Sequence, residues 1–339
     1  MDCFRSLDQV PEDFGATAVT IGNFDGVHRG HTRVIQTVVE QARAAGLKAV
    51  AISFDPHPAL VHRPDVPHYP IMGMRDSLDL LDELGLDALV LLPYSLEFAH
   101  QTPEDFIRQT FVEGLAAKKV VIGADVRFGR HNSGDLETMQ ALGEEYGFDV
   151  VVVEDLSTDN DLGELTGDAP HRRCSSTWIR ELLAAGDVET AAKLLGRFHR
   201  MRGEVVHGAA RGRELGFPTA NMAPGSDGLI PADGVYAGWL HDEAGLRWPV
   251  AISVGSNPTF EGVSRQVEAH VMGRPQEEVE DFNLYGQNVL LEFVAHLRPM
   301  VAYEGMDALI RQMAQDVDDA WAVLGQSSSS GPVPGAPRS

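Results

Sequence analysis

Cysteine is scarce in this sequence, since only Cys3 and Cys174 occur among 339 residues. Two cysteines cannot form the disulfide framework of a small secreted domain, and their scarcity fits a reducing cytoplasm. Long apolar runs are also missing, because no stretch approaches the roughly 18 residues that cross a bilayer. The N-terminus lacks the basic start and apolar core of a secretory signal. We therefore expect a cytoplasmic chain without a membrane partner.

Basic residues are few as well, with 27 lysines and arginines against 50 aspartates and glutamates and a formal net charge of −23. A general nucleic-acid surface needs a basic stripe, so we expect no nucleic-acid partner. An acidic chain that handles phosphates must gather its cations locally. The sequence does contain such groups, at Arg127 and Arg130, at Arg172, Arg173 and Arg180, and at Arg211 and Arg213.

The length predicts two domains, and the first is expected over residues 1–186. Apolar strands are expected at 18–21, 48–54, 88–92, 120–123 and 149–153, and helices at 32–45, 75–84, 103–117, 136–146 and 175–185. This alternation predicts a doubly wound parallel α/β domain. Ligands of such sheets bind beyond the carboxyl ends of the strands.

The stretch Thr20–His31 follows the first predicted strand and enters the first predicted helix. Gly22 and Gly26 keep the turn free of side-chain bulk. Unpaired backbone N–H groups at a helix start suit phosphate. His28 and His31 lie three residues apart there, where two imidazoles can donate hydrogen bonds to charge developing on a phosphoryl group. The alternative is a strand–turn–helix whose histidines are only polar surface residues.

Residues 155–173 are polar and lack a hydrophobic period, which indicates a mobile loop. The loop leads to Ser-Ser-Thr-Trp-Ile-Arg at the start of a predicted helix. Ser176 and Thr177 could act simply as N-caps. The functional interpretation is that they hydrogen-bond phosphate oxygens while Arg180 adds positive charge one turn later.

The second domain is expected over residues 187–325, where the pattern changes to short strands of period two separated by Gly, Pro and Asp. These strands are expected at 203–207, 234–240, 248–254, 266–272 and 289–297, and a helical period returns at 306–324. The pattern predicts an antiparallel β-barrel with a C-terminal helix packed on it. Residues 326–339 have low complexity and are expected to form a disordered tail.

A glycine-rich segment, 208–221, carries the chemistry of this second half. Its three glycines would let main-chain amides approach phosphate, although tight turns alone would also explain them. Thr219 and Asn221 supply two neutral oxygens that could coordinate Mg²⁺ already carried by nucleotide phosphates. Further along, Glu268 alternates with apolar strand neighbours and so faces away from them. It is either an exposed strand carboxylate or a functional one.

Several motifs carry a family resemblance. Gly-x-Phe-Asp-Gly-x-His-x-Gly-His at 22–31, together with Ser-Ser-Thr-x-Ile-Arg at 175–180, resembles the Rossmann-like nucleotidyltransferase superfamily that shares a fold core with class I aminoacyl-tRNA synthetases. Phe-Asp-Pro-His-Pro at 54–58 and Ile-Gly-Ala-Asp-Val-Arg-Phe-Gly at 122–129 resemble the adenylyltransferase module of bacterial FAD synthetases. Leu-Gly-Phe-Pro-Thr-Ala-Asn at 215–221 resembles the riboflavin kinase signature. The chain departs from that pattern in an acidic insertion at 273–281 and in Asn283, where aspartate is usual.

The resemblance implies a bifunctional riboflavin kinase and FMN adenylyltransferase. The second domain would transfer the γ-phosphate of ATP to riboflavin. In the first domain, FMN would attack the α-phosphate of a second ATP, giving FAD and pyrophosphate. Riboflavin, FMN and ATP are thus the expected partners, Mg²⁺ the expected metal, and a monomer or weak homo-oligomer the expected assembly.

The resemblance also implies roles for individual residues. His28 and His31 would stabilise the reacting α-phosphorus, Ser176, Thr177 and Arg180 the leaving pyrophosphate, and Glu268 would act as the general base of the kinase. Further ATP-binding residues would be Gly22, Phe24, Gly26, Gly208, Gly212, Arg213 and Gly216. The flavin-binding residues would be Phe54, Asp55, Pro56, His57, Pro58, Asp125, Arg127 and Phe128. Thr219 and Asn221 would be the metal ligands.

Two other functions compete with this one. A different adenylyl- or cytidylyltransferase, for example one acting on pantetheine phosphate, would leave the segment 215–221 and the barrel without a function. A non-catalytic flavin-binding protein predicts the loss of charged and phosphate-binding residues, whereas the sequence retains them.

Overall fold

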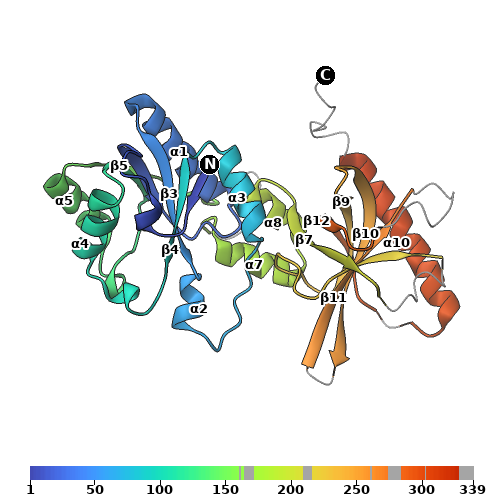
Figure 1. Ribbon diagram of the computed structural model, residues 1–339. Helices are drawn as coiled ribbons and strands as arrows, with labels where there is room; N and C mark the ends of the chain where they lie inside the picture. The colour runs from blue at the N-terminus through green and yellow to red at the C-terminus, as the bar shows by residue number, and fades with distance from the viewer. Residues whose placement is uncertain are drawn as a thin grey trace. The chain divides into compact units, whose positions relative to one another are not determined.

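The computed structural model describes residues 1–159, 162–163, 172–208, 216–259, 262–273, 284–301 and 303–327. The chain divides into two compact units (Figure 1). The first consists of Met1–Tyr69 and Met74–Ser176, and the second of Pro70–Gly73 and Thr177–Ser339. Among the described residues, no helix combines the length and the apolar character needed to cross a membrane.

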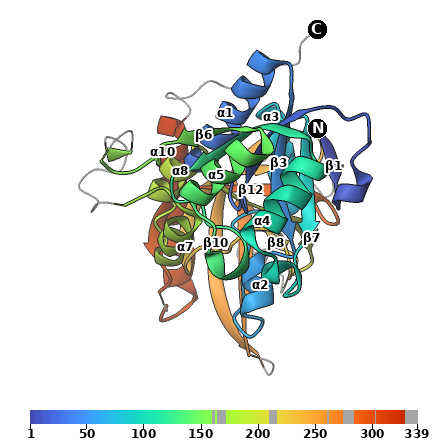
Figure 2. The ribbon, with the colours of Figure 1, turned by 90° about the vertical axis from the view of Figure 1, so that its left-hand side faces the viewer.

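A parallel sheet in the order β1-β4-β3-β2-β5-β6 forms the first unit. Its strands are β1 (Asp2–Phe4), β2 (Thr17–Ile21), β3 (Lys48–Asp55), β4 (Ala88–Pro93), β5 (Ala117–Gly123) and β6 (Asp149–Val153). The helices are α1 (Arg29–Ala45), α2 (Pro58–His62), α3 (Met74–Glu83), α4 (Pro103–Phe106) and α5 (Leu136–Tyr146), with short helical turns η1 (Leu7–Gln9), η2 (Phe98–His100), η3 (Ile107–Glu113) and η4 (Arg130–Asn132). The predicted parallel α/β fold is confirmed (Figure 2).

The pattern of buried residues explains why these strands form a parallel sheet covered by helices. β3 and β4 each contain five consecutive buried residues, the pattern of strands covered on both faces. Helix α1 buries Ile35, Val38 and Ala42 and contacts β2, β3 and β5. It ends where Gly46 adopts a left-handed conformation with φ of 66°, which glycine accepts at little cost.

Three local differences from the sequence predictions have physical causes. Helix α1 begins at Arg29 rather than near Thr32, because His28 acts as its N-cap. The helix predicted over 103–117 ends at Glu113 with the π-helical turn η3, and the residues from Ala117 onward form β5. Strand β1 was not predicted, because three residues are too few to show a periodic pattern.

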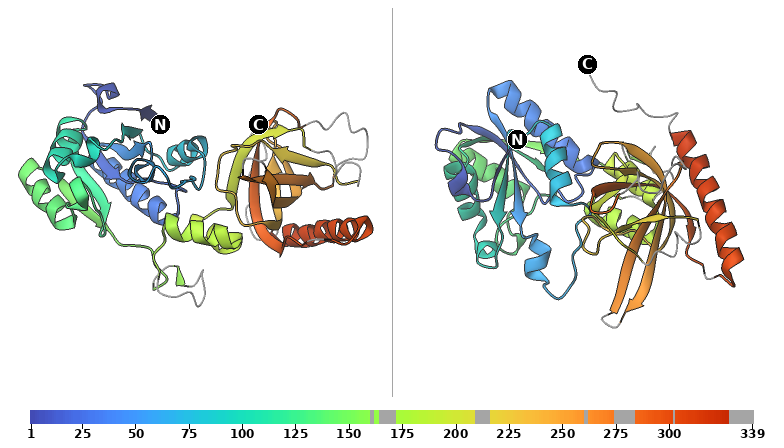
Figure 3. Two further views of the ribbon diagram at one scale, coloured as in Figure 1. Left: turned by 90° about the horizontal axis from the view of Figure 1, so that it is seen from below. Right: turned by 45° about the vertical axis from the view of Figure 1, so that its right-hand side comes forward.

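A closed antiparallel barrel in the order β10-β11-β8-β7-β12-β9 forms the second unit (Figure 3). Its strands are β7 (His199–Val206), β8 (Thr219–Met222), β9 (Gly234–His241), β10 (Arg247–Thr259), β11 (Gly262–Val271) and β12 (Asn288–Pro299), and its helices are α7 (Ser176–Ala185), α8 (Val188–Leu195) and α10 (Met306–Ser327). Ala320 and Leu324 of α10 are buried against Ala237 and Val294 of the barrel. The predicted barrel with a packed C-terminal helix is therefore confirmed.

Helix α7 belongs with the barrel apart from its first residue. The carbonyl of Leu183 accepts a hydrogen bond from the Ala232 N–H at 2.8 Å, and the short segment 70–73 joins the same unit through the Ile71 carbonyl, which accepts from Leu229 N–H at 3.2 Å. The compact units thus change between Ser176 and Thr177, while the expected domain boundary after residue 186 stays a prediction.

Two predicted flexible segments lie largely outside the described residues. In the loop expected over 155–173, residues 160–161 and 164–171 are not described. Its two described ends pair, because the Thr158 N–H donates to the Arg172 carbonyl at 2.9 Å and the Cys174 N–H to the Leu156 carbonyl at 2.8 Å. The tail was expected from residue 326, whereas α10 continues to Ser327 and residues 328–339 are not described.

Candidate functional site

A cavity of about 340 Å³ opens at the carboxyl end of the parallel sheet. Segments after four strands line it, with Gly22 and Asn23 following β2, Phe54 in β3, Tyr94 following β4, and Phe128 following β5. The chain continues from β2 toward β3 and β4 on one side and returns to β5 on the other, so the order of the strands reverses at this point. Open α/β sheets bind their ligands at such a switch point.

Aromatic rings form much of the cavity wall. Phe54 meets Tyr94 edge to face, with ring centroids 5.3 Å apart, and Phe98 at 5.8 Å. Phe106 packs beside Phe98 and Phe128. A concave apolar wall with a few polar groups suits a flat, largely apolar ligand.

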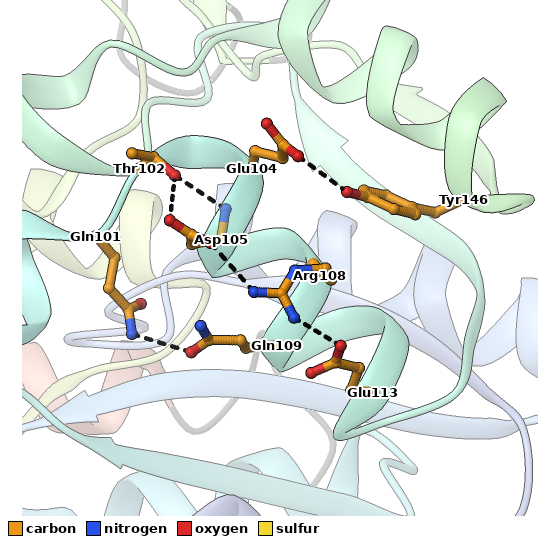
Figure 4. A network of polar contacts seen from close by, with 8 residues as sticks. All are labelled: Gln101, Thr102, Glu104, Asp105, Arg108, Gln109, Glu113 and Tyr146. Atoms are coloured by element: carbon orange, nitrogen blue, oxygen red, sulfur yellow. Dashed lines mark hydrogen bonds and ion pairs between the residues drawn. The ribbon is translucent and has the colours of Figure 1, made fainter.

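Gln101 lines one side of this cavity. A network of polar contacts follows it along the chain (Figure 4). Thr102 caps α4 by accepting a hydrogen bond from the Asp105 N–H at 3.1 Å, and its hydroxyl donates to the Asp105 carboxylate. Arg108 pairs with Asp105 at 3.1 Å and with Glu113 at 2.7 Å. These contacts fix the entry to α4 and so hold the adjoining cavity wall in place.

Of the predicted flavin-binding residues, five line the cavity: Phe54, Pro58, Asp125, Arg127 and Phe128. The structure does not bring Asp55, Pro56 and His57 to its lining. Asp55 pairs with Arg5 at 3.4 Å. His57 caps α2 by accepting from the Ala59 N–H at 3.1 Å, and its ring stacks on His68.

Sequence reasoning missed several lining residues, among them Tyr94, Phe98 and Gln101. The available signal was their place after β4, because every carboxyl end of a parallel strand faces the same edge of the sheet. At the mouth of the cavity, Asp125 forms an ion pair with Arg173, which also approaches Asp155 at 3.4 Å. Burial raises the pKa of the Asp155 carboxyl.

His28 and His31 lie together at the start of α1. Their rings stack with centroids 3.7 Å apart and planes 18° apart. The Nδ1 atom of His28 accepts a hydrogen bond from the His31 N–H at 3.3 Å. Because Nδ1 is the acceptor, the neutral His28 ring carries its proton on Nε2. His28 is only 5% exposed.

The loop between β2 and α1 is held under backbone strain. Phe24 and Val27 have φ angles of 46° and 36°, and Gly26 lies at 78°. A side chain at Gly22 would meet the Phe24 ring at 3.1 Å. Positive φ at a bulky residue persists only where the surroundings enforce it, and such residues gather at functional sites.

Ser176 joins this loop, because its hydroxyl donates to the Asp25 carbonyl at 2.9 Å. The structure thus brings Ser176 together with the loop that holds Gly22, Phe24 and Gly26 and with His28 and His31. Thr177 and Arg180 follow on α7 and belong to the second unit. Their position relative to His28 is therefore still a prediction.

In the barrel, β8 and β11 bring the predicted metal ligands beside the predicted base. Glu268 lies opposite Asn221 in the strand pairing. The Thr219 hydroxyl donates to the Glu268 carboxylate at 3.1 Å, and the Asn221 amide donates to the Thr219 hydroxyl at 3.4 Å. All three side chains are half-buried. One hydroxyl, one amide and one carboxylate therefore form a continuous polar cluster.

The glycine-rich segment before β8 is described only at its ends, so the predicted Gly212 and Arg213 lie outside the described residues. A Cβ atom at Gly208 would overlap the amide of Asn221, so a larger residue at this position would force the Asn221 side chain to move. Gly216 has φ of 86°.

The described residues include no group of three His, Cys, Asp or Glu side chains that could hold a metal ion. The barrel cluster nevertheless fits Mg²⁺ brought by a nucleotide. Because the Asn221 Nδ2 donates to Thr219, its Oδ1 faces other groups, and the Thr219 oxygen also retains acceptor capacity. Hard oxygen ligands of this kind are those that Mg²⁺ binds along with phosphate oxygens.

Comparisons with known families match both halves of the chain. A family model for FAD synthetase matches residues 10–164, and one for riboflavin kinase matches residues 195–324. The bifunctional riboflavin kinase/FMN adenylyltransferase of Escherichia coli K12 is 32% identical over 92% of this chain and 93% of its own length. The enzyme of the same name from Haemophilus influenzae is 33% identical over 95% and 99%.

The chain belongs to the bifunctional riboflavin kinase/FMN adenylyltransferase family. As a member, it phosphorylates riboflavin with ATP in its C-terminal half and converts FMN to FAD in its N-terminal half. The FAD synthetase match contains His28, His31 and the cavity, and the riboflavin kinase match contains Thr219, Asn221 and Glu268.

A solved structure supports the fold of this family member. It is described as a macrolide-efflux protein from Streptococcus pneumoniae, and it superimposes with a TM-score of 0.80 at 27% identity, over 94% of this chain and 97% of that one. The name belongs to that protein, and the likeness bears here on the fold.

Proposed function

We propose that the two reactions use separate centres, one built on the β2–α1 loop and one on the β8–β11 strand pair. The observation that carries this assignment is the His28–His31 pair, which lies at the N-terminus of α1, after the loop whose Gly22 and Asn23 line the switch-point cavity. Both reactions are in-line displacements at phosphorus, in which positioning and charge stabilisation dominate.

In adenylyl transfer, a phosphate oxygen of FMN attacks the α-phosphorus of ATP, and the bond to the pyrophosphate oxygen breaks. The Nε2–H of His28 donates to a non-bridging oxygen, where negative charge develops. The backbone N–H groups at the start of α1 and the loop glycines bind the nucleotide phosphates. Ser176, Thr177 and Arg180 bind the leaving pyrophosphate.

The flavin ring of FMN occupies the aromatic cavity, with its phosphate toward Gly22 and Asn23. The volume of about 340 Å³ lies within the usual range for small-molecule sites, and the aromatic wall matches a flat ring. Arg127 and Asp125 provide the polar rim. Asp55, Pro56 and His57 then act indirectly, by shaping the chain between β3 and α2.

In the kinase reaction, Glu268 takes the proton of the ribityl hydroxyl as its oxygen attacks the γ-phosphorus and ADP leaves. Thr219 and Asn221 hold Mg²⁺, which neutralises phosphate charge when bound. The hydrogen bond from Thr219 orients the Glu268 carboxylate. The glycine-rich segment, including Gly208, Gly212, Arg213 and Gly216, binds the phosphates of this second ATP.

We also infer that the enzyme is a monomer or weak homo-oligomer that acts in the cytoplasm without a nucleic-acid partner. The strongly acidic balance and the presence of only two cysteines, neither of which forms a disulfide, support this inference. Sedimentation velocity across a range of protein concentrations tests the state of assembly.

Crossed variants test the assignment of the two centres. The full chain is incubated with ATP, Mg²⁺ and either riboflavin or FMN, and the flavins are separated by chromatography. Glu268→Gln should slow FMN formation on the order of a thousandfold while added FMN still becomes FAD. His28→Ala should slow FAD formation on the order of a hundredfold while FMN accumulates. Loss of FAD formation from added FMN in Glu268→Gln, or loss of FMN formation from riboflavin in His28→Ala, would contradict separate centres.

A further inference from the structure

Cys174 lies against the imidazole of His28. Its Sγ atom is 3.6 Å from Nδ1 of His28, and each residue is only 5% exposed. The two residues are 146 positions apart in the sequence, so the contact is made by the fold. Nothing in the sequence patterns or in the proposed chemistry assigns a role to this thiol.

The N-cap of α1 shows which of the two groups, the Cys174 thiol or His28 Nδ1, donates the hydrogen bond. Nδ1 of His28 already accepts a hydrogen bond from the His31 N–H, so it carries no proton. The thiol is therefore the donor, and Nδ1 accepts a second hydrogen bond from it. Burial raises the pKa of the Cys174 thiol, although hydrogen bonds from the backbone of Gly30 and Arg29 act in the opposite direction. The sulfur thus keeps the proton that it donates.

Backbone contacts hold the sulfur in this place. The Cys174 N–H donates to the Leu156 carbonyl at 2.8 Å, and Ser176, two residues on, is tied to Asp25. The His28 ring stacks on His31 with centroids 3.7 Å apart, and the Gly30 backbone lies so near that an added Cβ atom would meet the ring at 3.1 Å. Donor and acceptor are both fixed.

We propose that Cys174 is a positioning residue that, with the His31 N–H, holds the His28 imidazole in the tautomer whose proton is on Nε2. A neutral imidazole has two tautomers, and only this one presents a donor from Nε2 to a phosphate oxygen. In the other tautomer an Nδ1–H would face both donors. The tautomer is a property of the free protein, whereas its kinetic consequence rests on the function proposed for His28.

Nitrogen-15 NMR of the full chain with labelled histidine tests the tautomer directly, because protonated and unprotonated ring nitrogens resonate far apart. His28 is assigned by comparison with His28→Ala. The wild type should show a protonated Nε2 and an unprotonated Nδ1, and Cys3→Ala, a change at the other, exposed cysteine, should match it. Cys174→Ala should move His28 toward a mixture of tautomers, while Cys174→Ser, which keeps a donor, should restore most of the wild-type pattern.

Kinetics supply a second measurement. In Cys174→Ala, kcat for conversion of FMN to FAD should fall about tenfold, with KM for FMN and ATP nearly unchanged. This change corresponds to about 1.4 kcal/mol, within the range for loss of one hydrogen bond. The rate of riboflavin phosphorylation reports that the chain is folded.

Three results would overturn the proposal. The first is a wild-type His28 that is protonated on Nδ1, and the second is an unchanged His28 tautomer in Cys174→Ala. The third is a Cys174→Ser variant whose tautomer is altered as much as that of Cys174→Ala, which would mean that the thiol only fills space. A changed tautomer with unchanged kcat would instead support the positioning role and contradict the catalytic role proposed for His28. The two failures are thus distinguishable.

Discussion

The two candidate centres are built in opposite ways. His28 and His31 lie three residues apart on one helix start, so local geometry brings their rings together. Thr219 and Glu268 lie 49 residues apart, and they meet only through the register of β8 against β11. A slip of one residue in that register would turn Glu268 to the other face of the strand. The histidine pair of the helix centre is therefore brought together by a local motif, whereas Thr219 and Glu268 of the barrel centre are brought together by strand register.

Each unit also contains a deeply buried histidine, and the two histidines differ in their surroundings. His28 has its Nδ1 engaged by the His31 N–H and the Cys174 thiol, and it caps α1 at the end of the strained β2–α1 loop. His199, at 1% exposure, donates from Nε2 to the Leu229 carbonyl at 2.7 Å and packs beside Phe293 inside the barrel. Burial alone thus does not mark a functional histidine, and what the ring faces decides its role.

The largest effect that we expect from the difference between these two histidines is on the pH dependence of barrel stability. Burial lowers the pKa of His199 from 6.5 to about 4. Below pH 6.5, His199 binds a proton in the unfolded chain but not in the folded barrel. Its contribution to stability is therefore complete above pH 6.5 and is lost as the pH falls toward 4. The difference corresponds to about 3 kcal/mol in the free energy of unfolding.

Tryptophan fluorescence during urea unfolding at pH 7.5, 6.0 and 5.0 measures this loss selectively, because all four tryptophans belong to the second unit. The matched variant His199→Gln keeps a donor toward Leu229 and does not titrate, so its stability should be flat between pH 6.5 and 5. Glu292, whose pKa is held low against the effect of burial by His241, Arg200 and Arg247, loses its contribution only at lower pH. Equal pH slopes in wild type and variant would show that His199 is not the titrating group.

The next test concerns the dependence of the barrel centre on close backbone approach. In Gly208→Ala, the new Cβ atom would overlap the Asn221 side chain, so the proposed metal ligand must move. We expect kcat/KM for riboflavin phosphorylation to fall about a hundredfold, as for loss of one well-placed charge-stabilising group, while FMN adenylylation is retained.

Gly255→Ala is the matched control for this variant. It places the same methyl group in the same barrel, where the nearest atom, Cε of Met300, would be 3.6 Å away in ordinary contact. An unchanged kinase rate in Gly208→Ala would mean that Asn221 can move freely, and it would argue against its role as a metal ligand.

The contrast between local and long-range construction explains what could be predicted from the sequence. The alternation of strands and helices was sufficient to predict the parallel sheet, and the period-two pattern was sufficient to predict the barrel. Both patterns arise from burial over many residues. The placement of His28 and His31 at a helix start was also predictable, since it depends on spacing alone.

Contacts between distant segments could not be predicted. Strand β8 has only four residues after a glycine-rich segment, and its register with β11 leaves no trace in the local sequence. Tyr94 and Phe98 lie in none of the motifs that the sequence analysis singles out, yet both line the cavity. His57 is polar and follows a strand, as a site residue would, yet it caps α2. The thiol of Cys174 reaches His28 only across the fold.

The smallest expected effect concerns the position of the His28 ring relative to the backbone of its own helix, and the variant Gly30→Ala tests it. A Cβ atom there would stand 3.1 Å from the His28 ring, a contact that requires a shift of a few tenths of an ångström. Alanine favours a helix more than glycine does, so thermal stability should stay the same or rise. FAD formation should nevertheless fall about tenfold, because a donor displaced from the phosphate oxygen loses part of its hydrogen bond.

This pairing of higher stability with lower activity separates displacement of His28 from general damage to the fold. Gly325→Ala on α10 makes the same change where no atom lies within 4 Å, so it should alter neither activity. Riboflavin phosphorylation should be unaffected in both variants, since neither change touches the barrel cluster. If Gly30→Ala were as active as the wild type, the His28 ring would have to tolerate the shift, and its close approach to the Gly30 backbone would not be what positions it.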